Sequence, residues 1–268
     1  MTGCGQLYER AAKADGLGPF WHLDQARTLF VGPLQHNGLH QHGAPVYLAG
    51  LYEAFELRLE GADWRQCRGA VIPAGCRHEL RVHGQPIAVF YIEPGADGIG
   101  SLTTLLGDVR EVGGALAGRP HGRNLLRELW EDRHGPQWTG QALDDLLTFA
   151  RPRACRQPDA RVARIMADLG HQSGTPMPAA RLAASVGLSA SRLQHLFTRE
   201  AGVPLRRYRA WQRMRVAIDA IIGGDNFTTA AHLAGFSDQA HFNHDFRRTF
   251  GAPPSVSLAR LRPGIGDA

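Results

Sequence analysis

Two segments of the chain carry polar side chains of the types that read DNA bases, at the spacing of an exposed helix face. Each segment also carries large apolar residues that must face a core, namely Leu193, Leu196 and Phe197 in the first and Phe242 and Phe246 in the second. The outward positions are then Ser191, Gln194 and His195 in the first segment and Gln239, Ala240, Asn243 and His244 in the second. Gln and Asn can pair bidentately with adenine, and His can donate to guanine N7 or to a phosphate.

Each of these segments is preceded by a shorter periodic run and a glycine break. The run PAARLAASV ends at Gly187, and the run TTAAHLA ends at Gly235. A short helix, a tight turn and a second helix form the helix-turn-helix unit, whose second helix enters the major groove with its N-terminal part. The stretch 175–251 is therefore predicted to hold two such units in tandem.

Residues 205–222, LRRYRAWQRMRVAIDAII, predict one long helix between the two units. Trp211, Met214, Ile218 and Ile221 fall three or four residues apart, so this helix packs on both units and fixes their separation. Arginines crowd its first part. We expect Arg199, Arg206 and Arg207 to contact the DNA, because phosphates take at least half of the hydrogen bonds in such interfaces.

The same residues resemble the DNA-binding domain of the AraC/XylS family of bacterial transcription regulators. The resemblance is carried by GLSASRLQHLFTREAGVPLRRY, by AAHLAGFSDQAHFNHDFRRTFG and by the helix between them. It covers roughly the last hundred residues, the size of an ordinary domain. It implies a regulator rather than an enzyme, with double-stranded DNA and RNA polymerase as partners and a homodimer as the working form. Whether it is an activator or a repressor is left open.

The charge distribution agrees with DNA binding by the C-terminal half. Residues 1–150 hold 13 Lys+Arg and 17 Asp+Glu, a net charge of −4, whereas residues 151–268 hold 17 and 8, a net charge of +9. A basic domain binds the DNA backbone by releasing counterions.

The four cysteines do not suggest a disulfide framework or a structural zinc site. Cys4, Cys67, Cys76 and Cys155 show no CxxC spacing. The sequence also has no apolar run long enough to span a bilayer, and its first residues lack the layout of a signal peptide. We therefore expect a cytoplasmic protein that does not enter the membrane.

From about residue 25 to 94 the chain reads as short strands separated by Gly, Pro and polar residues. In AFELRLE, the apolar residues Phe55, Leu57 and Leu59 alternate with charged ones, which is the period of a strand with one buried face. Several such strands predict a small antiparallel barrel or sandwich. With the helical C-terminal half, the fold class is α+β in two domains.

Two motifs in this region, HQH at 40–42 and PAGCRH at 73–78, resemble the two motif halves of a cupin barrel. Metal-binding cupins place three imidazoles at the positions of His40, His42 and His78, and imidazole suits Zn, Fe, Ni or Cu. The Glu that usually follows the HxH pair is absent, since Glu53 lies later. The resemblance thus leaves open a divalent transition metal or a structural histidine cluster.

Cys76 is either a soft ligand or an inert buried thiol. If the barrel instead binds a small organic effector, we expect Phe55, Leu57 and Val71 to line the pocket with His40, His42 and His78.

After residue 94 the apolar period becomes helical. The runs 101–106, 124–135 and 141–150 predict two or three helices behind the barrel, which in this family often mediate dimerisation. We therefore place a cupin-like effector-binding and dimerisation domain at 1–150, a linker at 151–159 and the DNA-binding domain at 160–262.

Three functions are compatible with this organisation. The first, which we favour, is a transcription regulator whose barrel senses a small molecule or a metal. The second is a metal-dependent cupin enzyme fused to a DNA-binding domain, against which the missing Glu argues. The third is a DNA-binding dimer without an effector.

Overall fold

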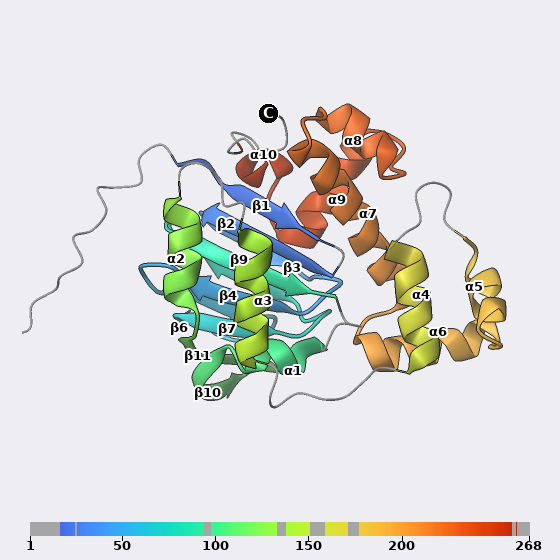
Figure 1. Cartoon of the computed structure of the whole chain (residues 1–268), viewed down its shortest axis with the longest axis horizontal. Helices are drawn as coiled ribbons and strands as arrows, with labels where there is room; N and C mark the ends of the chain where they lie inside the picture. Colours follow the sequence, from blue (N-terminus) through green and yellow to red (C-terminus); the bar gives the residue numbers. More distant parts are fainter. Residues whose placement is uncertain are drawn as a thin grey trace, which may run out of the picture.

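The computed structural model describes residues 17–24, 26–93, 98–132, 138–150, 159–170, 177–258 and 261. The N-terminal half forms two antiparallel sheets (Figure 1). The larger sheet has the order β1 (Phe20–Leu23), β2 (Arg27–Pro33), β9 (Pro86–Ile92), β4 (Val46–Gly50), β7 (Gly69–Ile72), β11 (Ala115–Pro120), β10 (Leu106–Val112). The smaller sheet has the order β3 (His36–His40), β8 (His78–Arg81), β5 (Phe55–Leu59), β6 (Arg65–Cys67). The predicted antiparallel β-domain is confirmed.

Successive side chains of a strand point to opposite faces of the sheet, and this alternation determines which of them face the barrel core. In β5, Phe55, Leu57 and Leu59 are buried, whereas Glu56 and Arg58 between them are partly exposed, as the sequence predicts. In β7, Ala70 and Ile72 point into the barrel core, and Val71 points to the opposite face.

Helices α2 (Arg123–Glu131) and α3 (Thr139–Ala150) lie across the outer face of the larger sheet (Figure 1). Leu126, Leu129 and Leu143 pack there in one buried cluster with Val71. The sequence predicts these two helices. It does not predict the hairpin of β10 and β11, which directly follows the short helix α1 (Gly98–Thr103).

The C-terminal half is helical, as expected. Its elements are α4 (Ala160–Gly170), α5 (Ala179–Ser185), α6 (Ala190–Ala201), α7 (Leu205–Ile222), α8 (Phe227–Leu233), α9 (Gln239–Phe250) and α10 (Pro254–Ser257). The predicted linker at 151–159 lies, except for its last residue, outside the described residues.

Both helix-turn-helix units have side-chain N-caps and left-handed glycines in their turns. The Ser189 hydroxyl accepts from the backbone N–H of Arg192 at the start of α6, and the Asp238 carboxylate accepts from that of His241 at the start of α9. Gly187 and Gly235 hold the turns at φ 67° and 76°, a region that disfavours residues with a Cβ. The two units therefore fold by the same local rules.

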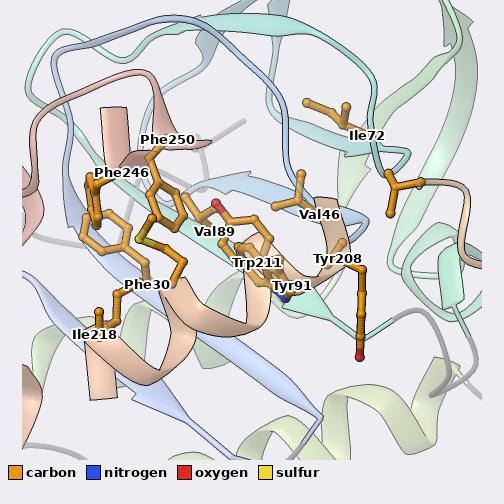
Figure 2. Packing of buried hydrophobic residues seen from close by; sticks show 14 of the residues in the cluster. Phe30, Val46, Ile72, Val89, Tyr91, Tyr208, Trp211, Ile218, Phe246 and Phe250 are labelled. Carbon is orange, nitrogen blue, oxygen red and sulfur yellow. The ribbon is translucent and has the colours of Figure 1, made fainter. Parts of the chain in front are cut away.

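The hydrophobic core continues from the barrel into the helical half. Figure 2 shows Trp211 of α7 and Phe250 of α9 beside Tyr91 and Val89 of β9. The Tyr91 and Trp211 ring centroids lie 4.8 Å apart. The barrel and the DNA-binding half thus share one apolar interface.

Candidate functional site

The predicted base-reading residues of the first unit are accessible on α6. Leu193 and Phe197 are buried, Leu196 is half-buried, and Ser191, Gln194 and His195 are all exposed. The apolar period therefore predicts correctly that these three residues are exposed, and their contact with DNA stays a prediction.

The second unit presents a less open face on α9. Ala240 and His244 are exposed, and Gln239 and Asn243 are half-buried. Gln239 Oε1 accepts from the Thr228 hydroxyl at 2.9 Å. Asn243 Oδ1 is buried and has no hydrogen-bond partner among the described residues. Both amides therefore have to rearrange before they can pair with a base.

The three arginines predicted to contact DNA lie in different surroundings. Arg199 is exposed and pairs with Glu200, at 3.0 Å. Arg206 is exposed, whereas Arg207 is half-buried. Both line a cavity that they share with the barrel residues Gln41 and Gly43.

His40, His42 and His78 come together inside the barrel mouth, as the cupin-like motifs predict. One nitrogen of each ring lies within 4.8 Å of one nitrogen of both others, and the three residues are 3%, 3% and 0% exposed. His40 ends β3 and His78 begins β8, and the two are paired across the smaller sheet.

Backbone carbonyls orient two of the rings. His40 Nδ1 donates to the Gly38 carbonyl at 2.7 Å, and His78 Nδ1 donates to the Cys76 carbonyl at 3.0 Å. These bonds select the tautomer in which Nε2 carries the lone pair. His78 Nε2 is buried without a hydrogen-bond partner among the described residues.

The surroundings keep all three imidazoles neutral. Burial lowers the pKa of His78 to about 4, although the Cys76 carbonyl opposes this shift. Burial and then repulsion from His78 hold the pKa of His40 well below its usual range. For His42, burial is again the larger cause of a strongly lowered pKa, followed by repulsion from His40 and His78. Neutral imidazole is the form that binds metal ions.

A cavity of about 30 Å³ adjoins two of the three histidines, His40 and His42. Its lining is mainly apolar with several polar residues, and includes His40, His42, Asn37, Tyr91, Trp21, Phe30, Leu34, Leu80, Val89, Phe250 and Ser257. Phe55 and Leu57 belong to the surrounding core without lining this cavity. Val71 lies on the outer face of its sheet, so it cannot line a pocket inside the barrel.

The sequence does not predict that α9, the second helix of the second helix-turn-helix unit, forms one side of this cavity. Phe250, the last residue of α9, lines it, and the Phe250 carbonyl accepts from Asn37 Nδ2 at 2.6 Å. The Gly38 N–H donates to the Gly251 carbonyl at 2.8 Å. A Cβ on Gly251 would lie 2.4 Å from the Gly38 carbonyl oxygen and 2.7 Å from His40 Nδ1, so only glycine permits this approach. The end of α9 is thus joined to the strand that carries His40.

A second set of bonds joins the barrel to α7. The buried Glu93 carboxylate accepts from Trp211 Nε1 at 2.8 Å, from Gln212 Nε2 at 2.9 Å and from Arg215 Nη1 at 2.9 Å. Arg215 also donates to the backbone carbonyl of Arg27 at 3.3 Å. No periodic pattern marks Glu93, because its partners lie more than a hundred residues later. Its place directly after an apolar strand was the available signal.

In the part of the chain that the structure describes, no helix is long and apolar enough to cross a membrane.

Comparison with known proteins agrees with the geometry of the helical half. Residues 182–260 match the family described as helix-turn-helix domain. The transcriptional regulator NimR of Escherichia coli is 25% identical over 237 residues, which cover 83% of this chain and 82% of NimR. The transcriptional regulator RipA of Corynebacterium glutamicum is 29% identical over 155 residues, which cover 48% of this chain and 45% of RipA.

The whole fold is similar to that of ToxT from Vibrio cholerae. An apo ToxT structure superposes with a TM-score of 0.60 at 12% identity, covering 87% of this chain and 96% of ToxT. ToxT with a bound unsaturated fatty acid gives a TM-score of 0.56 at 14% identity, covering 92% and 99%. Residues 182–260 thus form a helix-turn-helix domain in which one long helix joins two units behind an antiparallel barrel, the organisation of a DNA-binding transcription regulator.

Proposed function

We propose that the barrel is the sensor of this regulator and that His40, His42 and His78 bind a divalent transition metal ion. The observation that carries the proposal is the convergence of three buried, neutral imidazoles, two of them oriented by backbone carbonyls. A backbone carbonyl that accepts from the other ring nitrogen, as at His40 and His78, commonly fixes metal-ligating histidines in proteins. Metal content and DNA affinity, measured with and without His78, test the proposal.

The three residues fit a metal in chemistry and nearly in distance. Ligands about 2.1 Å from a tetrahedral ion lie about 3.4 Å from one another. The ring nitrogens here lie within 4.8 Å of one another, so small ring rotations bring them onto one ion. His78 Nε2 would gain the partner that it lacks among the described residues. The fourth position would remain for water or another ligand.

The size of the cavity favours an ion over an organic effector. About 30 Å³ is room for a water molecule or an ion, whereas pockets for organic ligands usually measure about 300–1,000 Å³. An organic effector is the second candidate, because most of the lining is apolar and ToxT has been crystallised with an unsaturated fatty acid. It requires the end of α9 to withdraw and enlarge the cavity.

Metal binding would change DNA binding through the contact between the end of α9 and the barrel. Gly251 touches His40, and Asn37 and Gly38 of β3 hold the carbonyls of Phe250 and Gly251. Rings that close onto an ion therefore move the strand to which α9 is joined. A ligand acts on a distant site to the extent that it binds one arrangement better than the other.

The remaining partners follow from the resemblance to AraC/XylS regulators. We propose that the chain acts in the cytoplasm as a homodimer on double-stranded DNA and acts on transcription through RNA polymerase. The C-terminal charge of +9 and the exposed reading face of α6 support the DNA contact.

Replacing Gln194 by alanine tests which face reads the bases. Gln194 is exposed near the middle of α6, and a lost bidentate contact costs about 1–3 kcal/mol at one base position. We expect Gln194→Ala to relax the preference at one position of sites selected from a randomised DNA library. The matched change Arg199→Ala should weaken all sequences alike and reduce the salt dependence. Identical library profiles for the two variants would show that α6 presents a different face.

A further inference from the structure

A second cavity, of about 230 Å³, lies where the two helices α7 and α9 meet the barrel. The barrel contributes Gln41 and Gly43, the residues on either side of His42. The helical half contributes the charged and polar residues Arg206, Arg207, Arg213, Asp245, Arg248 and Thr249, with Ala210, Trp211 and Met214 between them. The cavity is large enough for several water molecules, since one water takes about 30 Å³ in the liquid. It is separate from the smaller cavity at the histidines.

The lining of this cavity carries a large excess of positive charge. Four arginines face it, and Asp245 is the one carboxylate in the lining. Asp245 pairs at 3.7 Å with Arg213. Within the described parts of the chain, Arg206, Arg207 and Arg248 have neither an ion pair nor a hydrogen bond to another side chain. Three guanidinium groups from α7 and α9 therefore line one cavity, and none of them pairs with a carboxylate in the described parts of the chain.

The arginines of this cavity lie close enough to repel one another. Burial lowers the pKa of Arg207, and repulsion from Arg248, Arg206 and Arg77 lowers it further. Like charges in a partly buried site oppose folding unless a counter-charge joins them. Guanidinium groups bind phosphate and carboxylate groups through paired N–H donors, so a small anion with several oxygens relieves the repulsion.

We propose that this cavity binds a small multivalent oxyanion, carrying phosphate or several carboxylate groups, between Arg206, Arg207 and Arg248. The anion would join α7, α9 and the Gln41–Gly43 turn of the barrel, and would hold the two halves of the chain in the present arrangement. The site shares no ligand residue with the histidine cluster. The regulator would therefore have a second input, independent of the metal.

The geometry favours a small anion over the DNA backbone as the occupant. The barrel loop at Gln41 and Gly43 forms one wall of the cavity, which leaves more room for a small anion than for a duplex in this arrangement. Arg248 lies nine residues beyond Gln239, about 13 Å along α9 from the end that is expected to read bases. DNA phosphates become partners of these arginines if the barrel moves away.

Thermal unfolding of the full chain in inorganic phosphate and in succinate, each against sodium chloride of equal ionic strength, tests the proposal. We expect phosphate to raise the unfolding temperature of the wild-type chain by about 3 °C or more beyond chloride. Arg207→Gln with Arg248→Gln should abolish the excess shift, and Arg206→Gln alone should reduce it. Arg247→Gln removes a neighbouring exposed charge of α9 outside the cavity and should leave the shift intact.

Equal shifts in the wild-type chain and the double variant would overturn the proposal, because they would reflect the general stabilising effect of phosphate salts. No shift in any chain, with a loss of DNA affinity in the double variant, would also overturn it and assign the arginines to DNA phosphates. Repeating the measurement on His78→Ala separates this site from the proposed metal site. The anion shift should persist there, whether or not the histidines bind metal.

Discussion

Replacing Glu93 by glutamine is expected to loosen the barrel from the DNA-binding half and to lower the free energy of unfolding by about 3 kcal/mol. The Glu93 and Arg215 side chains are 11% and 10% exposed, so the substitution removes a buried negative charge that pairs at 2.9 Å with a buried cation. Glutamine also offers a single acceptor oxygen, where the carboxylate accepts from Trp211, Gln212 and Arg215.

Chemical denaturation followed by tryptophan fluorescence measures this effect, because Trp211 is buried at the interface. The matched control is Glu79→Gln. Glu79 pairs at 2.6 Å with Arg58 of the neighbouring strand, and Arg58 is 39% exposed, so the control should cost less than about 1 kcal/mol. If Glu93→Gln costs no more than the control, the carboxylate does not hold the two halves together.

Removing the His78 imidazole is expected to abolish metal binding. The wild-type chain, purified without an affinity tag, should bind one Zn²⁺, Ni²⁺ or Cu²⁺ per chain. His78→Ala deletes one of three ligands and should weaken metal binding by more than about 100-fold. Loss of a residue that only hydrogen-bonds to a metal ligand costs about 10- to 100-fold. Competition with a chromophoric chelator measures both affinities. His83→Ala is the control, because His83 is an exposed histidine outside the cluster.

Two outcomes would contradict the metal proposal. Equal metal affinity of the wild-type chain and His78→Ala would place the metal elsewhere. A wild-type chain that none of the added metals stabilises would leave an organic effector as the ligand of the barrel. The cavity would then have to enlarge at Phe250, the side closed by α9.

Local patterns in the sequence predict most of the secondary structure. The alternation in β5 and the three-to-four spacing in α6 and α9 each report which face is buried, and the structure has the same faces buried. The hairpin of β10 and β11 escapes this reasoning. It lies at the edge of the larger sheet, and β10 is largely exposed, so the β10 strand has no alternation of buried and exposed residues to detect.

The candidate site is predictable in part, for a related reason. The motifs around His40 and His78 locate the cluster, because short motifs and strand pairing bring these residues together. The closure of the site by Phe250 and Gly251, and the bonds from Glu93 to α7, depend on packing between residues more than a hundred positions apart. Such packing leaves no periodic signal in a single sequence. The prediction that Val71 lines the pocket is wrong for a different reason. Neighbouring side chains of a strand point to opposite faces, so an error of one residue places a side chain on the wrong face of the sheet.

The most direct test of the account is the effect of the metal on DNA binding by the full chain. The DNA would be a site selected from a randomised pool, and the measurement a hydroxyl-radical footprint titrated with protein, with and without Zn²⁺. We expect protection of two major-groove segments on one face of the duplex, about 34 Å apart. We also expect a change in affinity of at least about fivefold on adding metal to the wild-type chain, and none for His78→Ala. Stoichiometric metal binding that leaves the footprint and the affinity unchanged would contradict the account.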